Sequence, residues 1–175
     1  MTKEIQVFCA YDELVPIEKA KPNPQNPNTH PESQVKLLAE IIKKQGWRAP
    51  ITISNRSGYI VRGHGRLYAA QLLGAETVPV DFQDYASEAD EKADMLADNR
   101  LAELSEIDQE LLDSLLEELQ GLEDFDMLLT GYESLELEEF TATEDDIDSF
   151  FAEPTDEEKE EKKDTMVCPH CGNEI

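Results

Sequence analysis

The sequence predicts an α+β fold, in which a small mixed sheet with helices precedes an acidic helical extension and a disordered tail. Short β-rich runs at residues 51–53, 59–61 and 77–82 alternate with helical patterns in the first part of the chain. Charge then divides the 175 residues. Residues 1–85 carry ten Lys and Arg against nine Asp and Glu, a net of +1, whereas residues 86–175 carry five against thirty-one, a net of −26.

The amino-terminal part predicts a strand, a loop and a helix in that order. Residues 5–11 alternate loosely between apolar and polar side chains, which indicates a strand. Residues 21–28 contain three prolines and should be an extended loop, because proline fixes its own φ and moves its predecessor out of the helical region. A helix with Pro31 in its first turn then continues until Gly46. Trp47 follows and is expected in the core.

The middle of the chain predicts, in order, a hairpin, a helix, a strand and a second helix. The run Asn55–Gly58 between two β-rich segments is typical of a hairpin turn. A glycine turn precedes a helix that should end at Gly74. Pro79 lies in the next strand and predicts an edge position or a strand start. Ser87 should begin a further helix.

The turn Gly63-His64-Gly65-Arg66 joins a predicted strand directly to a predicted helix. Unpaired backbone N–H groups at a helix start attract anions, and glycines let the backbone approach a phosphate closely. Arg66 can add a charged fork, and His64 can donate to a phosphate or carry a proton near neutral pH. The alternative is a tight corner whose Arg66 lies in solvent. We predict a phosphate- or nucleotide-binding site formed by Gly63, His64, Gly65 and Arg66.

An ordered series of short motifs surrounds this turn. They are Asn26-Pro27, His30-Pro31, Gln34-Val35, Gly46-Trp47, Pro50-Ile51, Gly63–Leu67, Ala69-Ala70, Leu73-Gly74, Val78–Val80 and Ala97–Arg100. The series resembles the N-terminal domain of ParB-type partition proteins and of sulfiredoxin. It is most similar to the ParB-like domains of phages, which are often fused to DNA methyltransferases or encoded beside them.

The resemblance implies a ParB/sulfiredoxin-like fold over residues 1–104. In ParB-type members the glycine-arginine turn holds the phosphates of CTP, and an acidic residue followed by Asn on a later helix holds Mg²⁺. Asp98 and Asn99 match that pair, and their oxygens are ligands that magnesium prefers. Their alternative role is to face water or cap a turn. The resemblance thus implies a nucleoside triphosphate with Mg²⁺ as the ligand.

Two positions depart from the family pattern. ParB-type turns usually have Glu at the position of His64 and a second Arg at that of Gly65, and sulfiredoxin has its catalytic cysteine where His64 stands. The sulfiredoxin reaction therefore does not carry over, and CTP-switch behaviour does not follow from the resemblance. The sequence shows no basic helix-turn-helix region, and no carboxylate–histidine cluster in it supports the "nuclease" label used in the family.

Beyond residue 104 the sequence predicts an acidic extension and a linker. Residues 105–131 should be an acidic amphipathic helical extension, whose leucine-rich helix Asp108 caps and Gly121 ends. We expect its leucines to pack on their own domain, and the alternative is that they dock a partner helix. Residues 132–166 are rich in Asp and Glu and should be a largely disordered linker.

The tail, residues 167–175, contains Cys168 and Cys171 in a CxxC pattern that resembles a zinc knuckle. Zinc requires four ligands, and two thiolates supply only half of them. We therefore expect one of three arrangements: a Zn²⁺ shared by two chains in a homodimer, a site completed by a partner, or a vestigial knuckle.

Charge and hydropathy also bear on partners and location. The −26 of residues 86–175 repels a DNA backbone, because phosphate contacts require cations, so we expect no tight direct DNA binding by the full chain. No apolar run is long enough to span a membrane. Residues 1–6 lack the apolar core of a signal peptide, so we expect a cytoplasmic protein.

Three classes of function remain open at this point. The first is a nucleotide- or phosphate-binding accessory protein in phage or mobile-element DNA metabolism, acting in modification, partition or packaging with a methyltransferase- or terminase-like partner. The second is an enzyme on the same turn, such as a nucleotide hydrolase, a small-molecule kinase or a nuclease. The third is an acidic interaction protein that mimics DNA. Fold alone does not choose among them.

Overall fold

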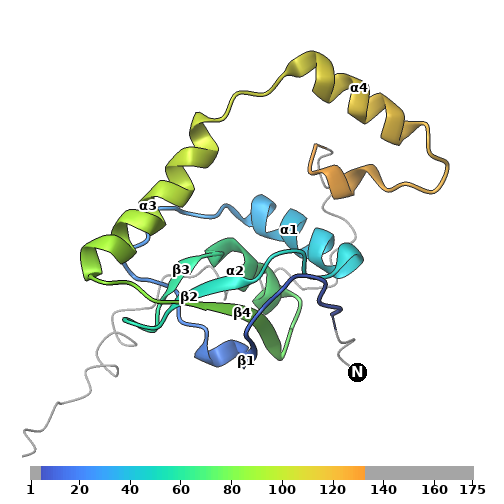
Figure 1. The fold of residues 1–175 in the computed structure, drawn as a ribbon. Helices are drawn as coiled ribbons and strands as arrows, with labels where there is room; N and C mark the ends of the chain where they lie inside the picture. Colours follow the sequence, from blue (N-terminus) through green and yellow to red (C-terminus); the bar gives the residue numbers. More distant parts are fainter. Residues whose placement is uncertain (1–4, 133–175) are drawn as a thin grey trace, which may run out of the picture. The chain divides into compact units, whose positions relative to one another are not determined.

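A four-stranded sheet and four α-helices account for most of residues 5–132, the part of the chain that the computed structural model describes (Figure 1). These residues lie in one compact unit. In chain order the elements are β1 (Glu13–Pro16), η1 (Ile17–Lys19), α1 (Glu32–Gln45), β2 (Ile51–Ser54), β3 (Ile60–Arg62), α2 (His64–Leu72), β4 (Thr77–Gln83), α3 (Glu88–Leu104), α4 (Gln109–Gln120) and η2 (Met127–Thr130).

The sheet is mixed, with the strand order β1-β4-β2-β3. Strand β4 pairs antiparallel with β1 and parallel with β2, where Val80 lies opposite Ile51. Strands β2 and β3 form an antiparallel hairpin, as the turn at Asn55–Gly58 predicts. The predicted α+β class with a small mixed sheet is therefore confirmed.

Pro79 lies in an interior strand, so the expected edge position is wrong. Strand β4 has β1 on one side and β2 on the other, and Pro79 is fully buried. Pairing with β2 begins at Val80, one residue after the proline, so the missing N–H interrupts no bond of that ladder. The alternative of a strand start is also wrong, because β4 begins at Thr77 and Pro79 lies opposite Leu14 within the ladder with β1.

The predicted amino-terminal strand is also misplaced. The first ladder strand is β1, and Val7 forms only an isolated bridge with Trp47. The backbone N–H of Phe8 donates to the Trp47 carbonyl at 2.9 Å, and the Trp47 N–H donates to the Gln6 carbonyl at 2.8 Å. This segment thus pairs with the loop after α1. The alternation of apolar and polar residues along residues 5–11 does not show which distant segment they pair with.

The core lies between the sheet and the paired helices α1 and α2 (Figure 1). Trp47 is only 1 % exposed, which confirms its expected place in the core. Apolar side chains from three strands and two helices also belong to the core and bury nearly all of their surface: Val35, Ala39, Ile42, Ile51, Ile53, Ile60, Leu67, Ala69, Ala70, Val78 and Val80. Burial of such side chains supplies the main driving force for folding.

Helix α3 is attached to the β2–β3 hairpin through a buried carboxylate. Glu91 is 4 % exposed and accepts hydrogen bonds from the hydroxyls of Ser54 at 2.8 Å and Ser57 at 2.5 Å. Met95, one turn further along, is also buried. Ser87 caps the helix, as predicted, by accepting from the Asp90 N–H. The amino-terminal half of α3 is therefore fixed to the sheet.

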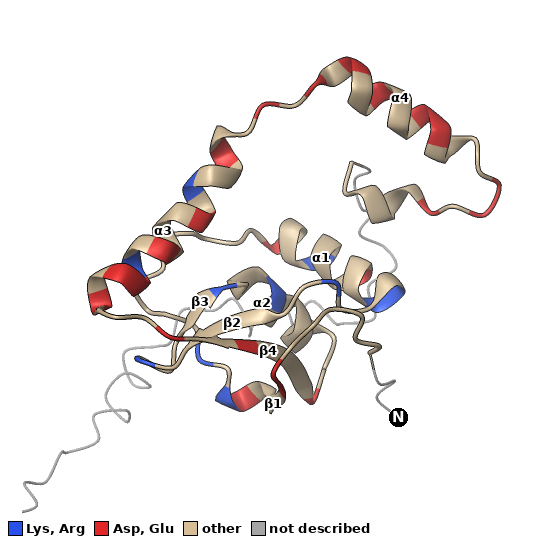
Figure 2. Ribbon diagram, in the orientation of Figure 1, with Lys and Arg blue, Asp and Glu red and all other residues tan. Residues whose placement is uncertain are grey.

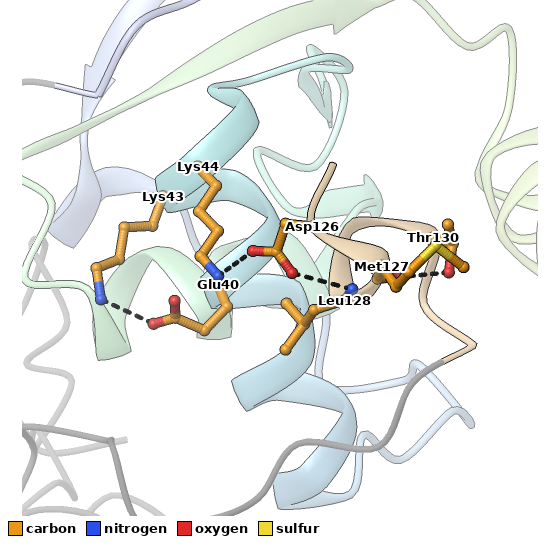
Figure 3. A network of polar contacts seen from close by, with 7 residues as sticks. All are labelled: Glu40, Lys43, Lys44, Asp126, Met127, Leu128 and Thr130. Atoms are coloured by element: carbon orange, nitrogen blue, oxygen red, sulfur yellow. Dashed lines mark hydrogen bonds and ion pairs between the residues drawn. The ribbon is translucent and has the colours of Figure 1, made fainter. Parts of the chain in front are cut away.

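The extension returns to α1 at η2 (Figure 3). Asp126 accepts a hydrogen bond from the Leu128 N–H at 3.1 Å and so caps η2, and its other oxygen pairs with the Lys44 ammonium. That ion pair lowers the pKa of Asp126 from its usual range. Next to it, Lys43 pairs with Glu40 at 2.8 Å. Asp126 thus helps to connect the extension to α1.

Helix α4 has the predicted ends but not the predicted packing. The Asp108 carboxylate accepts from the Leu111 N–H at 3.0 Å, and Gly121 is the C-cap. None of the residues of α4 is buried, so its leucines do not pack into the core of the domain. Among residues 5–132, no helix combines the length and apolar character that crossing a membrane requires. The linker and tail from residue 133 onward lie outside the described residues.

We predict that Gly46→Ala destabilises the domain far more than Gly74→Ala. Both glycines have positive φ, of 73° and 63°, so either alanine costs about 1–2 kcal/mol of backbone strain. A Cβ at Gly46 would also lie 2.5 Å from the Gln6 carbonyl oxygen, whereas nothing lies within 4 Å of one at Gly74. Urea denaturation should therefore show an additional loss of about 1–3 kcal/mol for Gly46→Ala. Equal losses in the two variants would contradict the close approach of the amino-terminal segment.

Candidate phosphate-binding site

The turn after β3 leaves the start of α2 without a side-chain cap. Gly63 is the N-cap, in the left-handed conformation with φ 95°, and its carbonyl accepts from the Leu67 N–H at 3.1 Å. No side chain caps this helix start. The N–H groups of His64, Gly65 and Arg66 belong to the first turn, which has no intrahelical partners for them. This arrangement suits an anion, because N–H dipoles and the helix dipole both favour negative charge.

Gly63 and Gly65 are each required at the turn for a different structural reason. Gly63 needs its positive φ, and a Cβ there would lie 3.4 Å from the Arg66 guanidinium and from the Ile51 backbone. Gly65 has no such φ, but a Cβ there would lie 3.2 Å from the His30 ring. His30 in turn packs edge-on against Tyr68 and bonds to Gln34 at 3.0 Å. Gly65 therefore allows His30 to approach α2, a role that the sequence analysis did not assign.

The His64 imidazole faces the protein interior. It is 5 % exposed, and its Nε2 accepts a hydrogen bond from the Asn23 backbone N–H at 3.1 Å. Burial, reinforced by nearby His30, lowers the pKa of His64 to about 4. The ring is thus neutral at pH 7, and the bond to Asn23 assigns its proton to Nδ1. This differs from the proton carrier near neutral pH that the sequence suggested, although the His64 backbone N–H still lies at the helix start.

The proline-rich loop is ordered beside the turn by its own asparagines. The Asn23 side chain accepts from the Gln25 N–H at 2.9 Å, and the Asn26 side chain accepts from the Asn28 N–H at 3.3 Å. The loop begins where the Lys21 carbonyl accepts from the first residue of β3 at 2.9 Å. Together with the bond to His64, these contacts hold the loop next to the start of α2. Asn side chains often accept a hydrogen bond from the backbone two residues later and so stabilise turns. The asparagines of this loop were therefore the sequence signal for its local order.

Arg66 supplies positive charge at the turn. Its guanidinium extends back over Gly63, and its charge also acts on the Cys9 thiol. Burial raises the pKa of Cys9, and the opposing effects of a backbone hydrogen bond and of Arg66 do not cancel that rise. Arg66 is half-buried, so it lies close to the backbone of the turn rather than extended in solvent.

Arg62 connects the turn to α3. Its guanidinium bonds to Asp94, and its Nε lies 3.7 Å from an Asp98 carboxylate oxygen. Tyr85 also donates to Asp94, at 2.7 Å. Burial opposes ionisation of Asp94, but the hydrogen bonds from Tyr85 and Arg62 lower its pKa below the usual range. Because Arg62 directly precedes Gly63, these contacts bring Asp98 to the same side of the domain as the turn.

The predicted magnesium pair therefore lies near the turn but does not form a complete metal site. Asp98 is exposed and Asn99 is half-buried, both on α3. Within residues 5–132 no group of three or more His, Cys, Asp or Glu side chains is placed to hold a metal. Magnesium commonly takes one or two protein ligands and completes its shell with phosphate oxygens and water, which these two residues fit. The predicted zinc ligands Cys168 and Cys171 lie outside the described residues.

The family of the chain is shown by its similarity to known proteins. The ParB N-terminal domain family matches residues 4–100. This chain belongs to that family. The ParB-like nuclease domain-containing protein YnaK of Escherichia coli (strain K12) is 42% identical over 65 residues, which cover 37% of this chain and 74% of YnaK. Membership of the ParB N-terminal domain family, which the motifs predicted, is thereby confirmed.

Two solved structures show a more distant similarity to this chain. The truncated chromosome-partitioning protein ParB from Caulobacter crescentus, complexed with CTP-gamma-S, has a TM-score of 0.48 and 24% identity, covering 79% of this chain and 69% of that chain. Sulfiredoxin from Arabidopsis thaliana has a TM-score of 0.38 and 25% identity, covering 42% of this chain and 84% of that chain.

We predict that acid destabilises the domain through His64. Its folded pKa of about 4 lies below the ordinary value of 6.5, so the unfolded chain takes up a proton more readily. The free energy of unfolding should fall as the pH drops from 6.5 toward 4, and less so in His64→Gln, which cannot be protonated. Urea denaturation of both proteins at neutral pH and about pH 5 tests this. An NMR titration of His64 with a midpoint near the ordinary value would contradict it.

Proposed function

We propose that this ParB-family domain binds a nucleoside triphosphate and holds its phosphates at the Gly63–Arg66 turn. The observation that carries the proposal is the uncapped start of α2 with the Arg66 guanidinium folded over the same turn. Helix starts of this kind bind phosphate in unrelated nucleotide-binding proteins. Membership of the ParB N-terminal domain family supports CTP as the first nucleotide to test.

Each residue of the turn has a separate task in this proposal. Gly63 gives the backbone its left-handed corner, and the N–H groups of residues 64–66 donate to phosphate oxygens. Arg66 adds a charged, directional donor. The His64 ring positions the proline-rich loop through Asn23 and leaves only its backbone N–H for the ligand.

Asp98 and Asn99 would hold a magnesium ion bound together with the phosphates. Such an ion would neutralise phosphate charge. Arg62 lies between Asp98 and the turn, and its contact with Asp94 keeps α3 near the site. In this proposal the protein supplies the Asp98 carboxylate on the same side of the domain as the turn.

We also propose that the protein works in DNA metabolism of a phage or mobile element, beside a methyltransferase- or terminase-like partner. Family membership supports a DNA-related role of the ParB type. The narrower setting is supported by the motif series shared with phage ParB-like domains. The identities of neighbouring genes test it, since unrelated metabolic neighbours would argue against this setting.

Arg66→Ala should weaken nucleotide binding about 10- to 100-fold, because a hydrogen bond to a charged group contributes about 1.5–3 kcal/mol. Arg56→Ala is the matched control, since Arg56 is an exposed arginine on the hairpin turn. Calorimetry with CTP, ATP, GTP and UTP, each with magnesium, measures the affinities. Arg66→Lys should give an intermediate value, because it keeps the charge and loses the fork.

Thermal melting of each variant shows whether the fold is retained. Unchanged affinity in a folded Arg66→Ala protein would contradict the assigned role of the guanidinium. If neither the four nucleotides nor inorganic phosphate bind the wild-type chain, the proposed site is wrong.

The full chain should bind naked duplex DNA only weakly. Residues 86–175 carry a net charge of −26, and release of counterions from DNA needs cations on the protein. A gel shift at moderate salt should show little retardation of the duplex with the wild-type protein. Nanomolar affinity under these conditions would overturn this interpretation of the charge distribution.

A further inference from the structure

Exposed apolar side chains concentrate in one stretch of the described chain. Seven of the twelve large apolar side chains that are exposed in residues 5–132 fall between Leu96 and Leu122. Isolated exposed leucines are normal on protein surfaces, but a continuous group of them marks an interaction site. This group runs from the carboxyl-terminal half of α3 along α4.

The leucines of α4 form a single face. We call Leu111, Leu112, Leu115, Leu116 and Leu119 the leucine face, because their spacing of three and four residues places them on one side of the helix. Leu111 is 58 % exposed and Leu115 is 49 % exposed, whereas Leu112, Leu116 and Leu119 are half-buried. No member of the face is fully buried, so the exposed part of the face centres on Leu111 and Leu115. An amphipathic helix gains stability mainly when such a face is covered.

Acidic residues occupy the remaining surface of α4 (Figure 2). Residues 105–132 contain nine Asp and Glu and no Lys or Arg, a net of −9. Glu110, Asp113, Glu117 and Glu118 lie within α4 itself. Whatever covers the leucine face must therefore meet a carboxylate-rich border, and basic side chains are the ones that match it.

The helix is held at both ends of the segment that contains it. Upstream, Glu91 and Asp94 attach α3 to the hairpin. Downstream, Asp126 pairs with Lys44 and caps η2 against α1 (Figure 3). A segment tethered at two points loses less conformational entropy on binding than a free tail does. The leucine face is thus presented by the domain rather than carried on a loose end.

Charge argues against the two occupants that the chain itself could supply. Residues 133–175 carry sixteen Asp and Glu against three Lys, a net of −13, so the chain's own tail would bring like charge to the border of the face. A second copy of α4 would likewise oppose one acidic helix to another, with no cation on either. Like charges at such close range cost affinity.

We propose that the leucine face is a docking site for a basic amphipathic helix of a partner protein. Leucine-like side chains of the partner cover the face, and its Lys or Arg residues pair with the carboxylates at the border. This mode resembles the binding of an amphipathic helix in an apolar groove, but here the partner helix packs against a single helix, α4. The site is separate from the Gly63–Arg66 turn, so partner docking and nucleotide binding use different surfaces of the protein.

The test uses the full chain and a synthetic helical peptide with leucines at i, i+3, i+4 and i+7 and lysines on both sides of that stripe. Fluorescence anisotropy should show binding with a Kd on the order of micromolar, which weakens with added salt. The double variant Leu111→Asn with Leu115→Asn should weaken binding at least about tenfold. Ser114→Asn with Gln120→Asn is the matched control, because both residues are exposed on α4 and lie outside the leucine face.

Circular dichroism should show equal helix content in the two double variants, and CTP affinity serves as a check on the rest of the domain. A peptide of the same pattern with glutamates in place of lysines should not bind. The proposal is overturned if the basic peptide does not bind, or if both double variants bind it equally. A concentration-dependent dimer of the wild-type chain that the leucine variant abolishes would also overturn it, because a second copy would then be the occupant.

Discussion

The hydrogen bond from the Asn23 backbone to His64 Nε2 holds together the region around the turn. It joins residues 41 apart in sequence and brings the proline-rich loop against the first residue of α2. The bond requires a neutral imidazole, and burial of the ring ensures this by lowering its pKa. Around this contact Gly65 admits His30, Gly63 turns the chain, and the helix start remains uncapped. The Nε2 atom of His64 is thus engaged by the loop, and the phosphate site that we propose relies on the backbone N–H groups of the turn and on Arg66.

A second contact, between Arg62 and Asp94, extends this order to α3. Together with the buried Glu91, it fixes the amino-terminal half of that helix on the hairpin and brings Asp98 beside the turn. Beyond Asp98, the carboxyl-terminal part of the helix exposes Leu101 and Leu104. Helix α3 therefore divides into a part that organises the phosphate-binding region and a part that leads to the leucine face. Helix α3 therefore links the sheet region to the acidic extension.

Local signals predicted the elements well because their causes are local. Gly46 ends α1, Ser87 and Asp108 cap their helices, and the Asn55–Gly58 turn forms the hairpin, each through contacts with residues close in sequence. Long-range partners were not visible in the sequence. The amino-terminal segment pairs with the loop after α1, β4 is flanked on both sides despite its proline, and the His64 ring is buried under a distant loop. For the candidate site, motif similarity located the turn, whereas only tertiary structure shows which atoms of the turn are already engaged.

The surroundings of Cys9 have a practical consequence for thiol chemistry. Alkylating reagents and disulfides react with the thiolate, and burial raises the pKa of this group even though Arg66 lies near it. Cys9 is half-buried and belongs to the segment that Gly46 holds against Trp47. We therefore expect modification of Cys9 at neutral pH to be slow while that segment stays in place and to accelerate when it detaches. The rate of labelling at Cys9 thus reports on local opening beside the phosphate-binding turn.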